Sequence, residues 1–297
     1  LTYSRNIGIG FNAGNDITTG VENTIIGSSA GDALTTGNSN VAIGYNALSD
    51  ETTGGGNVAI GKNAMQSSQL SQHNVGIGDG ALKNVTSSSL SNTYNIGVGY
   101  SAGVEITSGK YNILLGGIAG DAITTQESNI GIGYNALGAC TSNYNTAIGK
   151  NAGDSLTSGS NNIIIGYDAD VAAEDSTNSV TFGDANITAI RCQVQTISAL
   201  SDERDKTNIQ DSTYGLDYIN SLRPVTFEWN NREESVHKGT KDVGFIAQEL
   251  QKVDDEYTKL VLTDNPERLE ASYARLIPVL VKAIQDLSEE VKQLKNK

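Results

Sequence analysis

The feature that most constrains the fold is a short internal repeat that fills the first two thirds of the chain. The pattern Asn6-Ile7-Gly8-Ile9-Gly10 returns at intervals of 17, 17, 17, 17, 21, 17, 17, 16, 17 and 17 residues. The copies begin at Asn6, Asn23, Asn40, Asn57, Asn74, Asn95, Asn112, Asn129, Asn145, Asn162 and Ser179. Such a period is typical of a solenoid, in which each repeat forms one coil and stacks on the next.

The residue types within one copy favour a β-solenoid over a helical one. The fourth position is always apolar, the fifth is always glycine, and the eighth is alanine in ten of eleven copies. A glycine in every turn opposes helix, whereas two short strands and two turns fit well into 17 residues. We therefore predict a mainly β protein with a parallel β-roll or β-solenoid of about eleven turns over residues 1–189, with strands spaced by about 4.8 Å.

Stacking of identical turns predicts stacked side chains. We expect ladders of Ile from the fourth position, alanine where the walls approach each other, and amide ladders of asparagine. Cys140 occupies an inward Ile or Leu position and is interpreted as a small buried hydrophobic residue. Each turn offers only about three inward side chains, and so thin a core favours association of several copies.

The composition changes near residue 200. Of the 33 glycines, 30 lie in residues 1–200, whereas residues 201–297 contain the other three, all three prolines and the only tryptophan, Trp229. We predict the solenoid over residues 1–189, a linker over residues 190–200, and a small α+β domain over residues 201–297. The chain begins at Leu1 without a signal peptide, so we expect it to be the C-terminal piece of a longer protein.

Charge and composition exclude several classes of partner. The net charge is −14, and an acidic surface repels phosphate backbones and anionic membranes. No apolar run reaches the roughly 18 residues that a membrane span requires. Two cysteines, Cys140 and Cys192, do not make a disulfide framework. We therefore predict no nucleic-acid partner and no membrane insertion.

Two apparent ligand motifs have structural explanations. The segment Gly8–Ala13 looks like a dinucleotide fingerprint, but that motif needs one strand, one helix and a ribose-binding acid, and here it is copied along the repeats. His237 lies in a polar loop, and no His, Cys and carboxylate cluster has zinc spacing. The remaining alternative is a Ca²⁺ ion bound in the Asp-containing turns, at Asp16, Asp32, Asp121 and Asp154. These turns lack the dense Asp-Gly repeat of calcium-binding rolls. We predict neither a metal nor a cofactor.

The last segment predicts a long helix with an apolar seam. Its apolar residues follow one another at intervals of 4, 3, 4, 3, 4 and 3, which is a heptad pattern; they are Tyr273, Ile277, Leu280, Ile284, Leu287, Val291 and Leu294. Such a seam predicts a coiled coil with partner helices, and its Ile or Val alternating with Leu would by itself favour two strands. Pro278 predicts a kink in the first turn or the start of the regular helix there.

Four motifs in order carry a family resemblance. They are Ser201–Ile209, Leu222–Trp229, Val243–Leu250 and the heptad helix. In this order they resemble the endosialidase-type intramolecular chaperone, a self-cleaving serine peptidase domain at the C-terminus of phage tail spikes and fibres that is also found in myelin regulatory factors. The resemblance covers residues 201–297, with a lead-in at Ile190-Arg191-Cys192. It implies a homotrimer whose C-terminal domain assists assembly and then cuts itself off, and this overrides the preference for two strands.

The resemblance also implies a catalytic dyad of Ser201 and Lys206, with cleavage between Leu200 and Ser201. Serine needs a base, and a neutral lysine serves if desolvation or a nearby cation such as Arg204 lowers its pKa. Five residues on a straight helix lie about 140° apart, so the dyad needs a turn around Asp202–Asp205 or contacts from another copy. The alternative interpretation makes Ser201 a helix N-cap and Lys206 a solvated charge.

Other residues of these motifs are expected to support the fold. Gln248 and Glu249 match a family motif, and we interpret them as supporting residues. Arg223 and Trp229 are interpreted as packing or trimer contacts. The repeats resemble the head repeats of trimeric autotransporter adhesins, which share an N-x-V/A-I-G-x-x-A theme and build a parallel β-roll.

These observations predict a trimeric tail fibre or tail spike segment of a virion, assembled in the host cytoplasm. We expect a host cell-surface receptor, either a glycan or a surface protein, and the rest of the virion tail as partners. Repeats of one length pair almost equally well out of register, so a C-terminal clamp that trimerises first would align them. The alternative is the head of a bacterial trimeric surface adhesin without a viral role.

Overall fold

A computed structural model describes residues 5–187, 189–191, 193, 201–230, 238–263, 265–267 and 269–297. The chain divides into two compact units, Leu1–Asp184 and Ala185–Lys297, which we call the solenoid unit and the C-terminal unit. Leu200, Cys192 and His237, which the sequence analysis singled out, lie outside the described residues.

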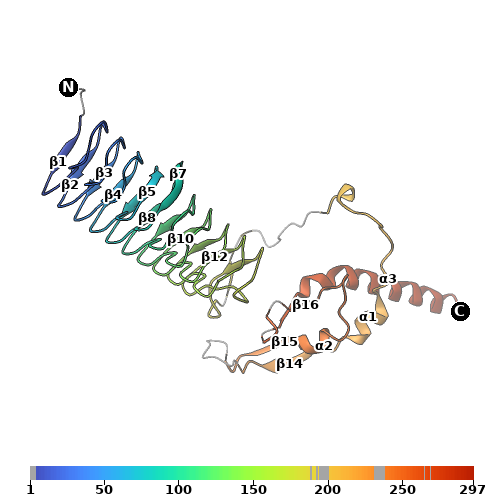
Figure 1. Cartoon of the computed structure of the whole chain (residues 1–297). Helices are drawn as coiled ribbons and strands as arrows, with labels where there is room; N and C mark the ends of the chain where they lie inside the picture. Colours follow the sequence, from blue (N-terminus) through green and yellow to red (C-terminus); the bar gives the residue numbers. More distant parts are fainter. Residues whose placement is uncertain are drawn as a thin grey trace. The chain divides into compact units, whose positions relative to one another are not determined.

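The main sheet of the solenoid unit is a parallel sheet of eleven strands, to which each turn adds one three-residue strand (Figure 1). All neighbouring strands pair in register, so that Val41 lies beside Val58 and Ile43 beside Ile60. The eleven strands are β1 (Ile7–Ile9), β2 (Thr24–Ile26), β3 (Val41–Ile43), β4 (Val58–Ile60), β6 (Val75–Ile77), β8 (Ile96–Val98), β9 (Ile113–Leu115), β10 (Ile130–Ile132), β11 (Thr146–Ile148), β12 (Ile163–Ile165) and β13 (Val180–Phe182). The predicted parallel β-solenoid is confirmed, with one strand in most turns where two were expected.

The expected asparagine ladder runs through the interior beside the sheet. The Asn6 side-chain oxygen accepts the backbone N–H of Asn23 at 2.8 Å and its amide N–H at 3.2 Å. The Asn23 amide also donates to the carbonyl oxygen of Gly37 at 2.9 Å, which lies in the turn before the next strand. Each buried amide thus satisfies backbone groups of a turn that has no second strand to pair with.

The expected ladder of Ile at the fourth position is present, since Ile43 lies beside Ile60, and the strand geometry decides which face of the sheet it occupies. In the strands of this sheet from β2 to β12, the central residue is buried and the residues on both sides of it face outward, as strand geometry requires. The fourth repeat position, exemplified by Ile43, is therefore on the outer face, and the third position, exemplified by Ala42 and Leu114, is in the core. The alanines of the eighth position are buried from Ala30 to Ala169, as predicted, and Cys140 is fully buried.

The core keeps its volume constant by exchanging large and small residues between two walls. Where the strand centre is Leu114, the opposite wall has Gly120, and a Cβ on that glycine would lie 2.6 Å from Leu114 Cδ2. Where the strand centre is Gly97, Leu82 fills the space, with its Cγ 2.7 Å from an added Cβ. Close packing therefore depends on pairs of positions, within one turn for Leu114 and Gly120 and between adjacent turns for Leu82 and Gly97.

One region of the solenoid departs from the repeat. Strands β5 (Gln69–Gln72) and β7 (Thr86–Asn92) form a second parallel pair with a register irregularity. Strand β7 lies in the longest repeat copy, which has 21 residues between its start at Asn74 and the next copy at Asn95. The fully buried Glu51 lies in the turn before the one that contains β5, at a repeat position that is apolar in most other turns, and it accepts backbone N–H groups on both sides.

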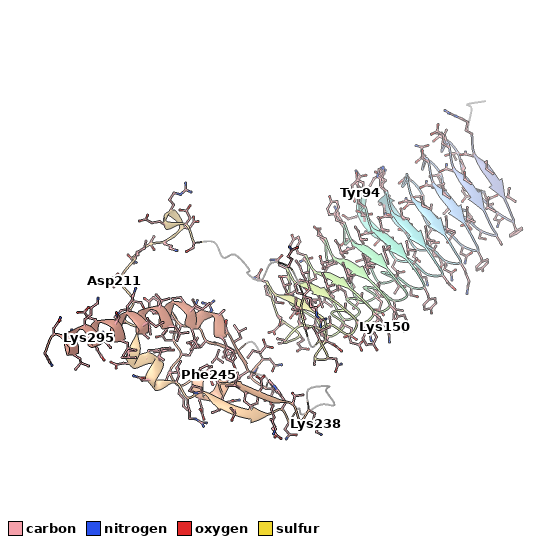
Figure 2. The ribbon with its side chains drawn as sticks, turned by 180° about the vertical axis from the view of Figure 1, so that it is seen from behind. Tyr94, Lys150, Asp211, Lys238, Phe245 and Lys295 are labelled. Atoms are coloured by element: carbon pink, nitrogen blue, oxygen red, sulfur yellow. The ribbon has the colours of Figure 1, made fainter. Side chains whose placement is uncertain are left out.

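The C-terminal unit is a small α+β assembly. Its elements are η1 (Glu203–Asp205), α1 (Leu216–Ser221), the antiparallel pair β14 (Val225–Glu228) and β15 (Lys241–Gly244), α2 (Ala247–Leu250), the antiparallel pair β16 (Val261–Leu262) and β17 (Glu270–Ala271), η2 (Tyr273–Arg275) and α3 (Leu276–Lys295). The core consists of Leu250, Leu260, Val261 and Leu276. Figure 2 shows Phe245 inside this unit, where its ring packs edge-to-face on Tyr273 at 5.6 Å.

The long helix was predicted, and the structure defines its start. Helix α3 begins at Leu276, so Pro278 lies in the first turn, where its missing N–H leaves no helical hydrogen bond unmade. Leu276, Val279 and Ala283 are the buried residues of the helix. None of the helices in the described part of the chain combines the length and apolarity that a membrane span requires.

Candidate functional site

The segment after Ser201 folds into one turn of 3₁₀ helix, η1. Asp202 is its N-cap, and its carboxylate accepts the backbone N–H of Arg204 at 2.9 Å. The backbone N–H of Lys206 closes the turn on the carbonyl oxygen of Glu203 at 3.0 Å. The chain therefore reverses between Ser201 and Lys206, which is the turn that the five-residue spacing required.

This reversal brings the two predicted dyad residues together. Lys206 Nζ donates to Ser201 Oγ at 2.6 Å and to the Ser201 carbonyl oxygen at 3.1 Å. The alternative interpretation of Ser201 as the helix N-cap does not hold, because Asp202 has that position. Lys206 is exposed, as that alternative expected, but its ammonium group is directed at the serine.

Arg204 does not stand as a free cation beside the lysine. Its guanidinium binds the Asp202 carboxylate through Nε at 3.0 Å and Nη2 at 2.6 Å. This hydrogen-bonded pair lowers the pKa of Asp202 and raises the pKa of Arg204. The Arg204 cation, which was expected to lower the pKa of Lys206, is therefore already balanced by the Asp202 carboxylate.

The site lies open to solvent in the single chain. All residues from Ser201 to Thr213 are exposed. A contact of 2.6 Å is within the reach at which an amine and a hydroxyl exchange a proton, but transfer from the serine requires a neutral amine. The geometry therefore supplies a nucleophile next to a base, while the dry surroundings that favour the neutral amine are not provided by the described residues of one copy.

Glu249 is held by Arg223 in the same unit. The Glu249 carboxylate accepts Arg223 Nε at 2.9 Å and Nη2 at 2.5 Å, and this hydrogen bonding lowers the pKa of the carboxyl group. Both side chains border a small hollow that Phe245 and Leu250 also line. Gln248 is exposed on α2. Among the interactions of the described residues, no hydrogen bond joins Glu249 to Ser201 or Lys206.

Trp229 takes part in local packing. Its ring packs edge-to-face on Phe227 at 5.2 Å, and its indole N–H donates to Asp242 at 3.4 Å across the hairpin. A residue missed at the sequence level is Asp254, whose carboxylate accepts the backbone N–H groups of Leu260 at 2.7 Å and Val261 at 2.9 Å. No pattern in the sequence distinguishes Asp254 from the neighbouring acidic residues.

The heptad seam of the terminal helix lies on the solvent side of this unit. Its seven residues are all more than a third exposed, including Ile284 at 66% and Leu294 at 69%. Tyr273, the first of them, precedes α3 and also accepts the backbone N–H of Phe245 on its hydroxyl at 3.2 Å. The helix thus has one apolar side in the core and a second apolar side that no described residue of the C-terminal unit covers.

No metal centre is found where the structure is described. Within that part of the chain, no group of three His, Cys, Asp or Glu side chains is arranged to hold a metal ion. Asp154 has a raised pKa, caused first by burial and then by the nearby Asp170 and Asp168 carboxylates. The mutual repulsion of these carboxylates follows from the stacking of adjacent turns.

Comparisons with known proteins agree with the motif order. The family described as chaperone of endosialidase matches residues 201–262. The "Long tail fiber protein Gp37" of Enterobacteria phage M1 and that of Enterobacteria phage Ox2 are each 36% identical to the chain over 98 residues. This alignment covers 32% of the chain and 38% of each relative, so the chain spans well under half the length of the relatives it matches. No solved structure matches the chain significantly.

The family match coincides with the part of the chain that contains η1, the β14–β15 hairpin and α2. The resemblance inferred from the four motifs is thereby confirmed. Residues 201–262 of the C-terminal unit match the chaperone-of-endosialidase family, and a domain of this kind behind a parallel β-solenoid fits a phage tail fibre.

Proposed function

We propose that this chain is a segment of a homotrimeric viral tail fibre whose C-terminal domain aligns three copies and then releases itself by autoproteolysis between Leu200 and Ser201. The contact of 2.6 Å between Lys206 Nζ and Ser201 Oγ, in a domain of this family, is the observation that carries the proposal. The two similar phage proteins are named long tail fibre proteins, which supports a place in a virion tail.

The proposed reaction is an acyl shift followed by hydrolysis. A neutral Lys206 amine accepts the Ser201 hydroxyl proton while Oγ bonds to the carbonyl carbon of Leu200. The C–N bond between Leu200 and Ser201 then breaks, and the lysine returns the proton to the departing nitrogen. The resulting ester between Leu200 and Ser201 Oγ is opened by water, which leaves a carboxylate on Leu200 and a new amino terminus at Ser201.

Trimer formation is proposed to complete the site. The dyad of one copy is exposed, and the exposed seam on α3 offers a surface through which three C-terminal units associate. Burial of the dyad in that assembly would favour the neutral amine, because desolvation disfavours a charged lysine. Cleavage would then follow assembly, so the clamp is removed only after it has aligned the solenoids.

The test is expression of the full chain beside Ser201→Ala and Lys206→Ala, with denaturing gels and intact mass. The expected result is fragments of residues 1–200 and 201–297 from the unmodified chain and an intact chain from both variants. Ser288→Ala and Lys238→Ala, which alter exposed residues of the same types in the same unit, are the matched controls and should cleave normally.

The oligomer is tested separately by native mass. Uncleaved Ser201→Ala should be a trimer, whereas adding Ile284→Lys in the seam should give monomers, and Gln285→Lys on the neighbouring exposed position should not. An unmodified chain that stays intact as a folded trimer would refute autoproteolysis. A chain that cleaves as a monomer would refute the requirement for assembly.

Attachment to a host is proposed from the same resemblance. The solenoid unit presents exposed side chains along its whole length, and a tail fibre of this kind would use them to contact a glycan or a protein of the host surface. The corresponding test is adsorption of the purified trimer to host cells, compared with cells from which surface glycans have been removed.

A further inference from the structure

The solenoid has an apolar outer face that no other described residue of the solenoid unit covers. The first and third residues of each strand face outward, and we call these 22 positions the strand face. The strand face consists of Ile7, Ile9, Thr24, Ile26, Val41, Ile43, Val58, Ile60, Val75, Ile77, Ile96, Val98, Ile113, Leu115, Ile130, Ile132, Thr146, Ile148, Ile163, Ile165, Val180 and Phe182. Twenty are apolar, two are threonine and none is charged.

These side chains are accessible although their neighbours above and below cover part of each one. The strand-face residues from Thr24 to Thr146 are partly exposed, and exposure rises toward the two ends of the stack, to 59% at Ile9 and 43% at Ile163. Eleven strands at about 4.8 Å and two outward columns about 7 Å apart give a strip roughly 50 Å long and, with its side chains, on the order of 500 Å² in area. An apolar patch of that size is at the upper end of what monomeric soluble proteins expose, and such patches are often functional.

Strand stability alone does not require this composition. Threonine has high β propensity and is accommodated at Thr24 and Thr146, so a solvated outer face would be expected to contain many such residues. Sheets with one solvated face ordinarily have polar residues on it. The near absence of polar residues over 22 positions therefore indicates a face that is buried in the assembled protein.

The columns that border the strand face have a different character. Tyr94 lies two residues before β8 and Lys150 two residues after β11, and Figure 2 shows them at opposite edges of the solenoid. The two borders contain stacked rings, such as Tyr94 on Tyr111 at 5.9 Å, and ion pairs, such as Lys62 with Asp79 at 3.9 Å. An apolar centre with an aromatic and charged rim is the composition of a protein interface.

We infer that the strand face is where the solenoids of identical copies pack against one another, side by side and in parallel. The strand face repeats every ~4.8 Å over ~50 Å, so only a partner with the same repeat matches it along its whole length. A second copy of this solenoid has the same repeat. This inference rests on the proposed trimer and assigns the solenoid surface that it uses.

The same face explains the need for a separate clamp. Ile and Val recur at both outward positions, so two copies shifted by one turn would bury almost the same apolar surface. The strand face therefore supplies affinity between copies but little information about their axial register. The register has to come from elsewhere in the chain, and the seam on α3 is outside the repeat.

Cysteine crosslinking in the full chain tests the assignment. Each variant carries Ser201→Ala to prevent cleavage and Cys192→Ser to remove the linker thiol, while Cys140 is buried. Under mild oxidation, Ile130→Cys on the strand face should give covalent dimers on a denaturing gel. Ser155→Cys, at an exposed position on another wall of the solenoid, should remain monomeric on the gel. Leu287→Cys in the α3 seam should form covalent dimers and so report whether the C-terminal units associate.

A pair of charge substitutions provides a second measurement. Ile130→Lys should lower the thermal midpoint of the trimeric solenoid, whereas Tyr134→Lys in the border of the same turn should not, because Lys62 and Lys150 occupy that repeat position. Crosslinking of Leu287→Cys without crosslinking of Ile130→Cys would overturn the strand-face interface and leave the trimer standing. A monomeric native mass for all variants would overturn the proposed trimer instead.

Discussion

The carboxylate of Glu51 accepts the backbone N–H of Leu70 at 3.0 Å from a position with no solvent exposure. It also accepts the N–H groups of Gly54 at 2.7 Å and Ser71 at 3.2 Å, so one buried side chain ties two consecutive turns together. In the preceding turn the equivalent residue is Leu34, which packs in the core. Glu51 therefore replaces apolar packing with hydrogen bonding where the irregular region of the solenoid begins.

We expect Glu51→Ala to destabilise the solenoid unit by about 3 kcal/mol or more. The substitution leaves several backbone N–H groups without acceptors, and each buried unsatisfied group costs about 1–3 kcal/mol. Glu51→Gln retains one acceptor oxygen and should cost less. Chemical denaturation followed by far-UV circular dichroism measures the difference, with Asp50→Asn at the adjacent exposed position as the control. Equal stability of Glu51→Ala and Asp50→Asn would contradict this role.

Substitution by alanine should greatly destabilise the solenoid at one glycine and leave its stability nearly unchanged at another. A Cβ on Gly149 would lie 2.1 Å from the carbonyl oxygen of Gly166, and the Gly149 φ is +138°, so Gly149→Ala should cost about 3–5 kcal/mol or prevent folding. A Cβ on Gly117 would come no closer than 3.5 Å to any atom, and Gly117→Ala should change stability by less than about 1 kcal/mol. Thermal unfolding of both variants checks this, and a folded Gly149→Ala chain of normal stability would be inconsistent with it.

The fold could be predicted largely because the repeat encodes it. Period, strand position and the asparagine ladder follow from the spacing of Asn, Ile and Gly, and the structure has all three. The direction of the side chains could not be predicted, because a strand of three residues is too short to show alternation. Glycine at Gly97 and Gly131 further obscures the inward position, since the large residue then lies elsewhere in the core.

The sequence predicted the two members of the candidate site and part of its geometry. The five-residue spacing of Ser201 and Lys206 required a turn around Asp202–Asp205 or contacts from another copy, and the structure has the turn; its form could not be predicted. Their contact depends on the one-turn η1 helix and on Asp202, whose side chain caps it. Capping by Asp202 rather than by Ser201 depends on backbone dihedral angles that the residue types alone do not determine.

The two units should respond in opposite directions to acid. In the C-terminal unit, a hydrogen bond from Tyr214 lowers the pKa of Asp255 to about 2, and a hydrogen bond from Lys282 lowers the pKa of Asp286. A lowered native pKa contributes stability above the ordinary value near 4, which is lost as the pH falls toward the native pKa. We therefore expect the C-terminal unit to lose stability between about pH 5 and pH 2.

In the solenoid unit the sign is reversed. Burial, followed by nearby carboxylates, raises the pKa of Asp32 and Asp154, so their protonation is easier in the folded state and adds stability as the pH falls through the raised values. Trp229, the only tryptophan, reports the C-terminal unit by fluorescence, and hydrogen exchange of peptides from the solenoid unit, followed by mass spectrometry, reports the solenoid. In Ser201→Ala chains, the thermal midpoint measured by Trp229 fluorescence should be lower at pH 3 than at pH 7. The thermal midpoint of the solenoid unit should not fall in parallel. Parallel losses in both signals would argue against the assignment.

The last prediction separates a supporting role of Glu249 from a catalytic one. The ion pair with Arg223 is largely exposed, so Arg223→Ala, Glu249→Ala and the double variant should each lower the thermal midpoint by only a few degrees. Because the pair acts as one unit, the double variant should be little worse than either single variant. All three should still cleave between Leu200 and Ser201, as judged by intact mass. Loss of cleavage in Glu249→Ala, in a chain that remains folded and trimeric, would place this carboxylate in the reaction itself.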